Sequence, residues 1–72
     1  MIIIVNGEPT DIAEGSGISD LIKSVGLDAK RVAVELNKRI VRRVDWDSTT
    51  ISEGDKVEIV HFVGGGEGSR DA

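Results

Sequence analysis

One segment of this 72-residue chain has the apolar spacing of a helix, and strand-like segments lie on both sides of it. Its apolar residues recur every three or four positions, at Ile18, Leu21, Ile22 and Val25. Ser16 or Gly17 can cap the start of this helix, and Gly26 can end it. Because one helix covers only one face of a sheet, the sequence predicts an α+β domain with a helix over residues 18–25 on one face.

The strand-like segments form two hairpins around the helix and one further strand after it. The predicted strands are Met1–Val5, Glu8–Ile12, Val32–Leu36, Arg39–Arg42 and Lys56–Val63. Asn6-Gly7 accepts the positive φ values of a type I′ turn, and Asn37-Lys38 is the second turn. Pro9 suits an edge strand. The first and last strands are the most apolar, so we expect them to pair in parallel at the centre of a five-stranded mixed sheet.

Alternating side chains assign two faces to each strand. Glu58 must face water, which puts Val60 and Phe62 on the outer face of the sheet, and Asn6 sends Ile4 outward in the same way. We expect Trp46, the only tryptophan, to cap one end of the core. The other residues expected in the core are Ile3, Val5, Leu21, Val25, Val34, Leu36, Val57 and Ile59.

Composition narrows the classes of function. Thirteen acidic and nine basic residues give a net charge of −4, the wrong sign for a general nucleic-acid binder. The longest apolar run, Met1–Val5, is far too short to span a membrane. The absence of cysteine favours a reducing, cytoplasmic setting. His61, the only histidine, has no nucleophile or metal-ligand pattern around it, so we expect neither catalysis nor a metal site.

Two stretches carry a resemblance to a known family: VELNKRIV at residues 34–41 and GDKVEIVHFVGGG at residues 54–66. Together they resemble the ThiS family of thiamine-biosynthesis sulfur carriers, and the resemblance covers residues 1–66. It implies a ubiquitin-like β-grasp fold with the order ββαββ and a final β. The expected domain is residues 1–66, followed by an extension over residues 67–72 that we expect to be flexible.

The resemblance also implies a role in which the carrier catalyses nothing and binds no cofactor. A ThiF-like adenylyltransferase would use ATP to activate the terminal carboxylate of Gly66, and sulfur would then replace AMP. The resulting thiocarboxylate would give its sulfur to a ThiG-like thiazole synthase. Gly64 and Gly65 would thread the tail into the nucleotide site, because glycine has no Cβ and accepts either sign of φ.

Four residues are expected to form the interface with such partners. They are Ile4, Val60, Phe62 and Val63, which we expect to form one apolar patch beside the tail. Lys38, Arg39, Arg42 and Arg43 form a basic cluster that either guides docking or is a solvated hairpin.

The chain departs from the family at its end, where Glu67–Ala72 follow the glycines. An amide bond at Gly66 leaves no carboxylate to activate. Either a peptidase trims the chain after Gly66, or the chain is a ubiquitin-like interaction module that is never activated. A further alternative within the fold is the small subunit of molybdopterin synthase, the related carrier MoaD, which shares the Gly-Gly chemistry.

Overall fold

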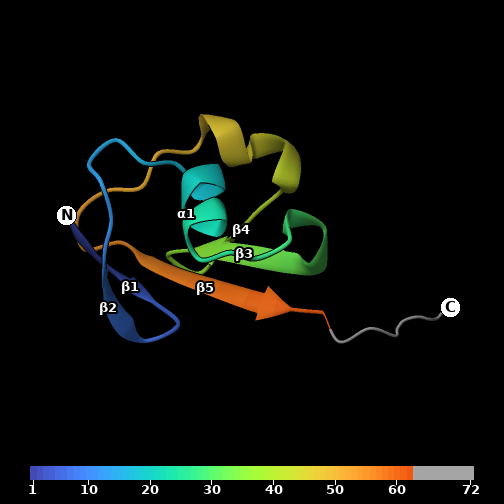
Figure 1. Ribbon diagram of the computed structural model, residues 1–72, viewed down its shortest axis with the longest axis horizontal. Helices are drawn as coiled ribbons and strands as arrows, with labels where there is room; N and C mark the ends of the chain where they lie inside the picture. The colour runs from blue at the N-terminus through green and yellow to red at the C-terminus, as the bar shows by residue number, and fades with distance from the viewer. Residues whose placement is uncertain (63–72) are drawn as a thin grey trace, which may run out of the picture.

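A five-stranded mixed sheet with one α-helix on one face makes up the computed structural model, which describes residues 1–62 (Figure 1). The elements are β1 (Ile2–Val5), β2 (Glu8–Asp11), α1 (Ile18–Ser24), the 3₁₀ helix η1 (Ala29–Arg31), β3 (Val32–Leu36), β4 (Arg39–Val41), the 3₁₀ helix η2 (Arg43–Ser48) and β5 (Lys56–His61). Helix and strand bounds agree with the predicted ones to within two residues. The expectations for Val63, the glycines and residues 67–72 lie outside the described residues.

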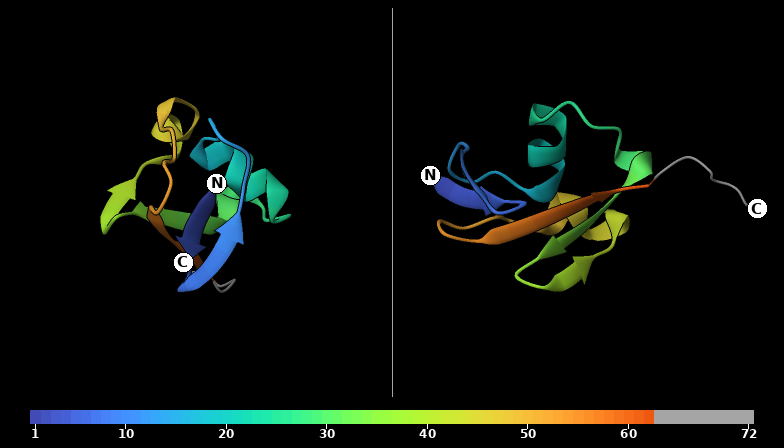
Figure 2. Two further views of the ribbon diagram at one scale, coloured as in Figure 1. Left: turned by 90° about the vertical axis from the view of Figure 1, so that its left-hand side faces the viewer. Right: turned by 90° about the horizontal axis from the view of Figure 1, so that it is seen from below.

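The strand order across the sheet is β2-β1-β5-β3-β4. β1 and β5 are central neighbours and run parallel, with Ile4 opposite Lys56 and Val5 opposite Val57. Every other pair is antiparallel. Figure 2 shows β2 and β4 at the two margins of the sheet, with α1 and η2 on the same side of it. The predicted parallel pairing of the first and last strands and the edge position of Pro9 are confirmed.

Both hairpins close through two-residue turns in the left-handed region. Asn6 and Gly7 have φ values of 50° and 84°, and Asn37 and Lys38 have φ values of 51° and 71°. Two successive positive φ values define the type I′ turn, whose twist matches that of the paired strands. The turns therefore fix the register of both hairpins.

The start of α1 is tied to the segment that follows η2. Ile18 N donates to Thr49 O at 3.2 Å, and Ile51 N donates to Ser16 O at 2.9 Å. A Cβ on Gly17 would lie only 3.0 Å from Thr49 O, so a larger residue here would push this segment away by a few tenths of an ångström. The sequence did not predict η1, η2 or this contact, because short 3₁₀ segments have no apolar period of their own.

The core lies between the sheet and α1. Its buried side chains are Ile3, Ile18, Leu21, Ile22, Val32, Val34, Trp46, Ile51 and Val57. Trp46 is buried as a core residue, and its Nε1 donates to Val41 O at 2.9 Å, which satisfies the indole N–H.

The predicted core needs one correction and three adjustments. Val25 is 42% exposed, so its predicted burial is wrong: it is the C-cap of α1, past the last turn that faces the sheet. Val5, Leu36 and Ile59 are partly buried and pack against the core from its margin.

No helix within residues 1–62 is long and apolar enough to cross a bilayer.

Replacing a buried β1 residue should be far more costly than replacing the exposed helix cap. Ile3→Ala should lower the free energy of unfolding by about 2–5 kcal/mol, because it leaves a cavity under α1. Val25→Ala, the matched control, should change it by less than ~0.5 kcal/mol. Urea unfolding of the two variants measures both. Similar losses would contradict this assignment of the core.

Candidate functional site at the carboxyl end of β5

Two residues, Phe62 and Val63, separate the end of the central strand β5 from the glycines at residues 64–66. The antiparallel pairing of β5 with β3 continues to its end, where His61 lies opposite Val32. One step further, Phe62 N donates to Arg31 O at 2.8 Å. The chain is therefore held by hydrogen bonds up to the residue before Val63, on the side that faces β3.

On the other side, the Asn6 side chain replaces the missing continuation of β1. Ile59 N donates to Asn6 Oδ1 at 2.7 Å, and Asn6 Nδ2 donates to Ile59 O at 3.3 Å. These two bonds pair the backbone N–H and C=O of Ile59, both of which face the side where β1 has ended. Asn6 thus fixes β5 shortly before the tail, a role that its turn-forming sequence pattern gave no reason to expect.

The apolar residues predicted to contact a partner have different exposures. Val60 and Phe62 are 54% and 56% exposed, and Val60 lies opposite Ala33 on the outer face. Ile4 is half-buried and lies opposite Lys56. The exposed Glu58 follows Lys56 on that face, so the register separates Ile4 from Val60 along β5. A partner interface that includes them remains a prediction, and Val63 lies outside the described residues.

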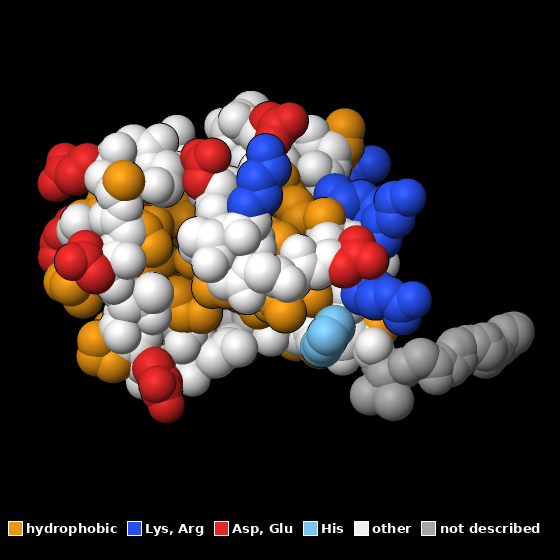
Figure 3. Space-filling view, in the orientation of Figure 1, with side chains coloured by type: hydrophobic (Ala, Val, Ile, Leu, Met, Phe, Trp, Pro, Cys, Tyr) orange, Lys and Arg blue, Asp and Glu red, His pale blue; other side chains and the backbone are white. Residues whose placement is uncertain are grey.

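Basic side chains surround the same end of the molecule. Figure 3 shows Lys and Arg gathered near the end of β5, with several acidic side chains at the opposite end. Arg31 lies beside Phe62 through the backbone bond, and Arg43 reaches η1 by donating to Ala29 O at 3.4 Å. Arg31 has only a long contact with Asp28, at 3.6 Å, and both side chains are more than half exposed. Such a surface favours a partner with acidic groups.

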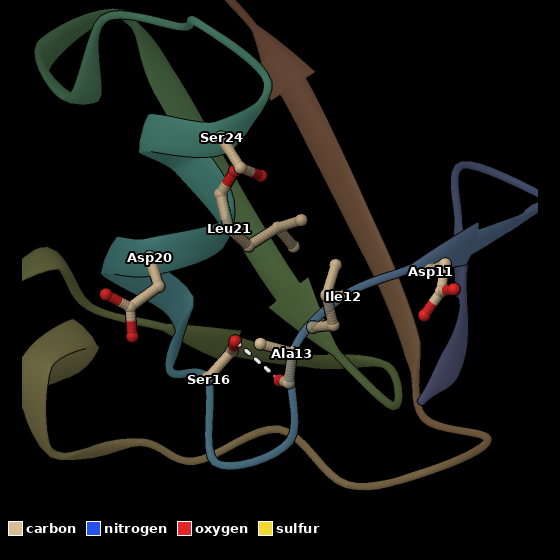
Figure 4. Close-up of a pocket in the computed structure, with 7 residues that line it drawn as sticks. All are labelled: Asp11, Ile12, Ala13, Ser16, Asp20, Leu21 and Ser24. Carbon is tan, nitrogen blue, oxygen red and sulfur yellow. Dashed lines mark hydrogen bonds between the residues drawn. The ribbon is translucent and has the colours of Figure 1, made fainter.

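A hollow lies away from this end, between the segment after β2 and α1 (Figure 4). Its lining residues are Asp11, Ile12, Ala13, Ser16, Asp20, Leu21 and Ser24. The polar groups are occupied by local bonds: Ser16 Oγ donates to Ala13 O at 2.6 Å, and Asp20 accepts from Gly17 N at 2.9 Å. The hollow brings together no nucleophile and base, so it does not form a catalytic site.

The His, Asp and Glu side chains of residues 1–62 are scattered over the domain. Within this range no group of three or more His, Asp or Glu residues could hold a metal ion. His61 lies at the end of β5, opposite an apolar valine. What the described part offers is a rigid strand that delivers the following residues from one end of the sheet.

Comparison with known proteins adds to this geometry. Residues 3–66 match the ThiS family, a range that ends at the last of the three successive glycines. The chain belongs to the ThiS family.

Its ThiS relatives include short proteins and parts of longer ones. The chain is 40% identical over 63 residues to a sulfur carrier protein ThiS from Bacillus subtilis, covering 86% of this chain and 96% of that one. It is 39% identical over 67 residues to a thiazole synthase from Magnetococcus marinus. That alignment covers 93% of this chain but spans only 21% of the thiazole synthase.

The crystal structure of a ThiS protein from Geobacter metallireducens has the same fold. It superposes with a TM-score of 0.80 at 38% sequence identity, covering 92% of this chain and all of the other. The predicted ubiquitin-like β-grasp fold and the resemblance to ThiS are thereby confirmed.

The asparagine contacts to β5 predict separate effects at its two ends. Asn6 Oδ1 accepts from Ile59 N, and Asn37 Oδ1 accepts from Lys56 N at 3.0 Å. Asn6→Gly keeps a residue that tolerates the positive φ but removes the side-chain bonds. Amide exchange of Ile59 should then become about three- to tenfold faster, since such a bond contributes a net ~0.5–1.5 kcal/mol.

Asn37→Gly is the matched control and should accelerate exchange of the Lys56 amide while leaving the Ile59 amide unchanged. Hydrogen exchange followed by NMR measures both amides in the same sample. If either variant accelerates both amides equally, the two contacts are not local constraints on β5.

Proposed function

We propose that this member of the ThiS family is a sulfur carrier of thiamine biosynthesis, whose reactive group is the terminal carboxylate of Gly66. The observation that carries the proposal is the match to ThiS through residue 66, joined to a central strand that ends just before the glycines. The chain acts as a co-substrate of other enzymes and binds no cofactor of its own. We place it in the cytoplasm, in keeping with the absence of cysteine.

The chemistry proposed for Gly66 has two steps. A carboxylate is ionised at neutral pH and is a poor electrophile. An oxygen of the carboxylate attacks the α-phosphorus of ATP on a ThiF-like adenylyltransferase, which gives an acyl-adenylate and releases pyrophosphate. Hydrosulfide, the simplest sulfur nucleophile, then attacks the acyl carbon, AMP leaves with the electron pair of the broken C–O bond, and loss of the proton from sulfur gives the thiocarboxylate. A ThiG-like thiazole synthase takes this sulfur.

The architecture supports delivery of the tail into an enclosed site. Arg31 O accepts from Phe62 N on one side of β5, and the Asn6 side chain bonds to Ile59 on the other, so the chain is held on both sides close to the end of β5. Gly64 and Gly65 add no side chains that a narrow passage must accommodate. A fixed origin lowers the entropy lost when the tail enters the partner enzyme.

The proposed contact surface is the outer face of β5 beside the tail. Phe62 and Val60 are exposed there and lie closest to the glycines, whereas Ile4 lies further back along the sheet. We include Val63 in the proposal because it follows Phe62 in the sequence, although it lies outside the described residues. An aromatic side chain that becomes buried on binding is a frequent centre of binding energy.

This proposal has two versions, which differ in what happens to residues 67–72. In the first, a peptidase cleaves after Gly66 and exposes the reactive carboxylate, so residues 1–66 are the working domain. In the second, the chain serves as an interaction module that binds through Val60 and Phe62 and is never activated. The match to ThiS, which runs through the glycines, favours the first version.

Truncation after Gly66 should determine whether the chain can be activated. The truncated chain should support ATP–pyrophosphate exchange with a ThiF-type adenylyltransferase and, with a sulfur donor, gain the mass of sulfur in place of oxygen. The chain ending at Ala72 should do neither, because Arg70 and Asp71 have side chains that a passage shaped for glycine excludes. Exchange assays and intact mass spectrometry measure both activities.

A variant at the reactive residue provides the control for folding. Gly66→Val in the truncated chain should leave the unfolding midpoint unchanged but abolish pyrophosphate exchange, since the branched side chain restricts φ and widens the tip. Equal activation of the truncated chain and the chain ending at Ala72 would refute both the site and the need for trimming.

Phe62 provides a separate test of the contact surface. Phe62→Asp should weaken binding to the adenylyltransferase by roughly 10- to 100-fold, because a charge is buried where an aromatic anchor was. Val44→Asp is the control: Val44 is 75% exposed but belongs to η2, on the helix side of the sheet. Isothermal titration measures both affinities. An unchanged dissociation constant for Phe62→Asp would remove Phe62 from the interface.

A further inference from the structure

The two hairpins of this fold have the same turn and the same register, which makes their outer strands directly comparable. In the first hairpin Val5 pairs with Glu8 across the turn, and Ile4 pairs with Pro9. In the second, Leu36 pairs with Arg39 and Glu35 pairs with Ile40. Pro9 and Ile40 therefore occupy equivalent positions, each at the second pair of its hairpin and each on a margin of the sheet.

Neighbouring hydrogen bonds show whether the backbone groups of Pro9 and Ile40 point toward the paired strand or toward the outer margin of the sheet. In the first hairpin, Ile12 N donates to Met1 O, and Met1 N donates to Ile12 O. Because hydrogen-bonded and non-hydrogen-bonded pairs alternate in an antiparallel ladder, the Ile4–Pro9 pair is of the second kind. The backbone of Pro9 thus faces the outer margin, where the missing N–H leaves nothing to donate.

The same reasoning applies to the second hairpin. Asn37 N donates to Lys56 O and Phe62 N donates to Arg31 O, so the odd-numbered residues of β3 direct their backbone groups to β5. Glu35 is one of these residues, and its partner Ile40 is consequently not hydrogen-bonded to β3. The N–H and C=O of Ile40 both face the outer margin. Within residues 1–62 neither of these two groups of Ile40 forms a hydrogen bond with a turn, a loop or a side chain.

The sheet therefore has one closed margin and one open margin. Pro9, the second of the four residues of β2, closes the first margin, a device that natural edge strands often use. The equivalent position in β4 is Ile40, whose side chain is 75% exposed and whose backbone N–H and C=O face outward. If β4 needed only protection from pairing, a charged residue or a proline would be expected at this position.

The charged side chains of residues 38–43, on β4 and its two flanks, are all basic. Four of the nine Lys and Arg residues of the chain lie within residues 38–43, and all four are exposed. They are Lys38, Arg39, Arg42 and Arg43. The opposite margin is acidic, since Glu8 and Asp11 are the two ends of β2. The nearest acidic residue across from Ile40 is Glu35, which is half-buried on β3.

We propose that β4 is a docking edge for an extended segment of a partner protein, which adds to the sheet as a sixth strand and carries acidic residues on both sides of an apolar centre. Backbone pairing at Ile40 would supply the hydrogen bonds, and the flanking arginines would select for negative charge. β3 lies between this edge and β5, and the proposal does not depend on the proposed sulfur-carrier function.

Charge excludes a second copy of this chain as the occupant. An antiparallel pairing of two β4 strands centred on Ile40 would place Lys38 opposite the other copy's Arg42 twice, and like charges opposite one another are destabilising. The β2 margin of a second copy has the right charge, but Pro9 removes the central donor. A nucleic acid is disfavoured because it offers no backbone amides to pair with and the whole chain carries a net charge of −4.

Titration of the ¹⁵N-labelled full chain with the peptide acetyl-EDVIVED-amide tests the proposal by NMR. Amide shifts should centre on residues 38–42, and the Ile40 amide should become protected from solvent exchange. Ile40→Pro, which copies the closed margin at Pro9, should weaken binding about three- to tenfold. The double variant Arg39→Glu, Arg42→Glu leaves the strand backbone intact and should weaken binding at least tenfold, with a smaller effect at high salt.

Pro9→Ile is the matched control, because it opens the other margin but leaves Glu8 and Asp11 around it. It should bind the acidic peptide at β4 as the parent chain does and gain no shifts in β2. Absence of binding would overturn the proposal. Shifts centred on Val60–Phe62, or equal binding by the parent chain and by both β4 variants, would also overturn it.

Discussion

The parallel pairing of β1 with β5 is the contact on which the rest of the fold depends. It joins strands from the two ends of the described chain. The first hairpin reaches the rest of the sheet through β1, and the second hairpin reaches it through β3, which pairs with β5. Parallel neighbours need a long connection, and here that connection contains α1, both 3₁₀ helices and the second hairpin. Closing so long a loop has an entropic cost, which the buried layer between sheet and helix must offset.

The asparagines of the two turns fix the position of β5, because their side chains bond to its backbone. Because β1 runs parallel to β5 and β3 runs antiparallel to it, the ends of β1 and β3 reach opposite ends of the central strand. Asn6 meets Ile59, and Asn37 meets Lys56 and Asp55. The residue type that allows the left-handed turn also supplies the amide that bonds to β5. The same two residues therefore set the hairpin registers and the position of the strand that leads to the tail.

Most of this architecture could be predicted from residue patterns. The period of Ile18, Leu21 and Ile22 predicted the helix, and the alternation around Glu58 predicted the exposed face of β5. What failed depends on tertiary contacts. Val25 continues the helical period, but the helix ends one residue earlier, and the buried Ile51 has no periodic neighbours to identify it. The asparagine contacts with β5 join residues far apart in sequence, and no local pattern predicts them.

Trp46 has a consequence for how this protein can be observed. It is the only tryptophan, there is no tyrosine, and its indole is buried and bonded to Val41 O, at the end of β4. Intrinsic fluorescence therefore arises from a single chromophore embedded between η2 and the margin of the sheet. Its emission reports on the integrity of the core and of β4 in one signal.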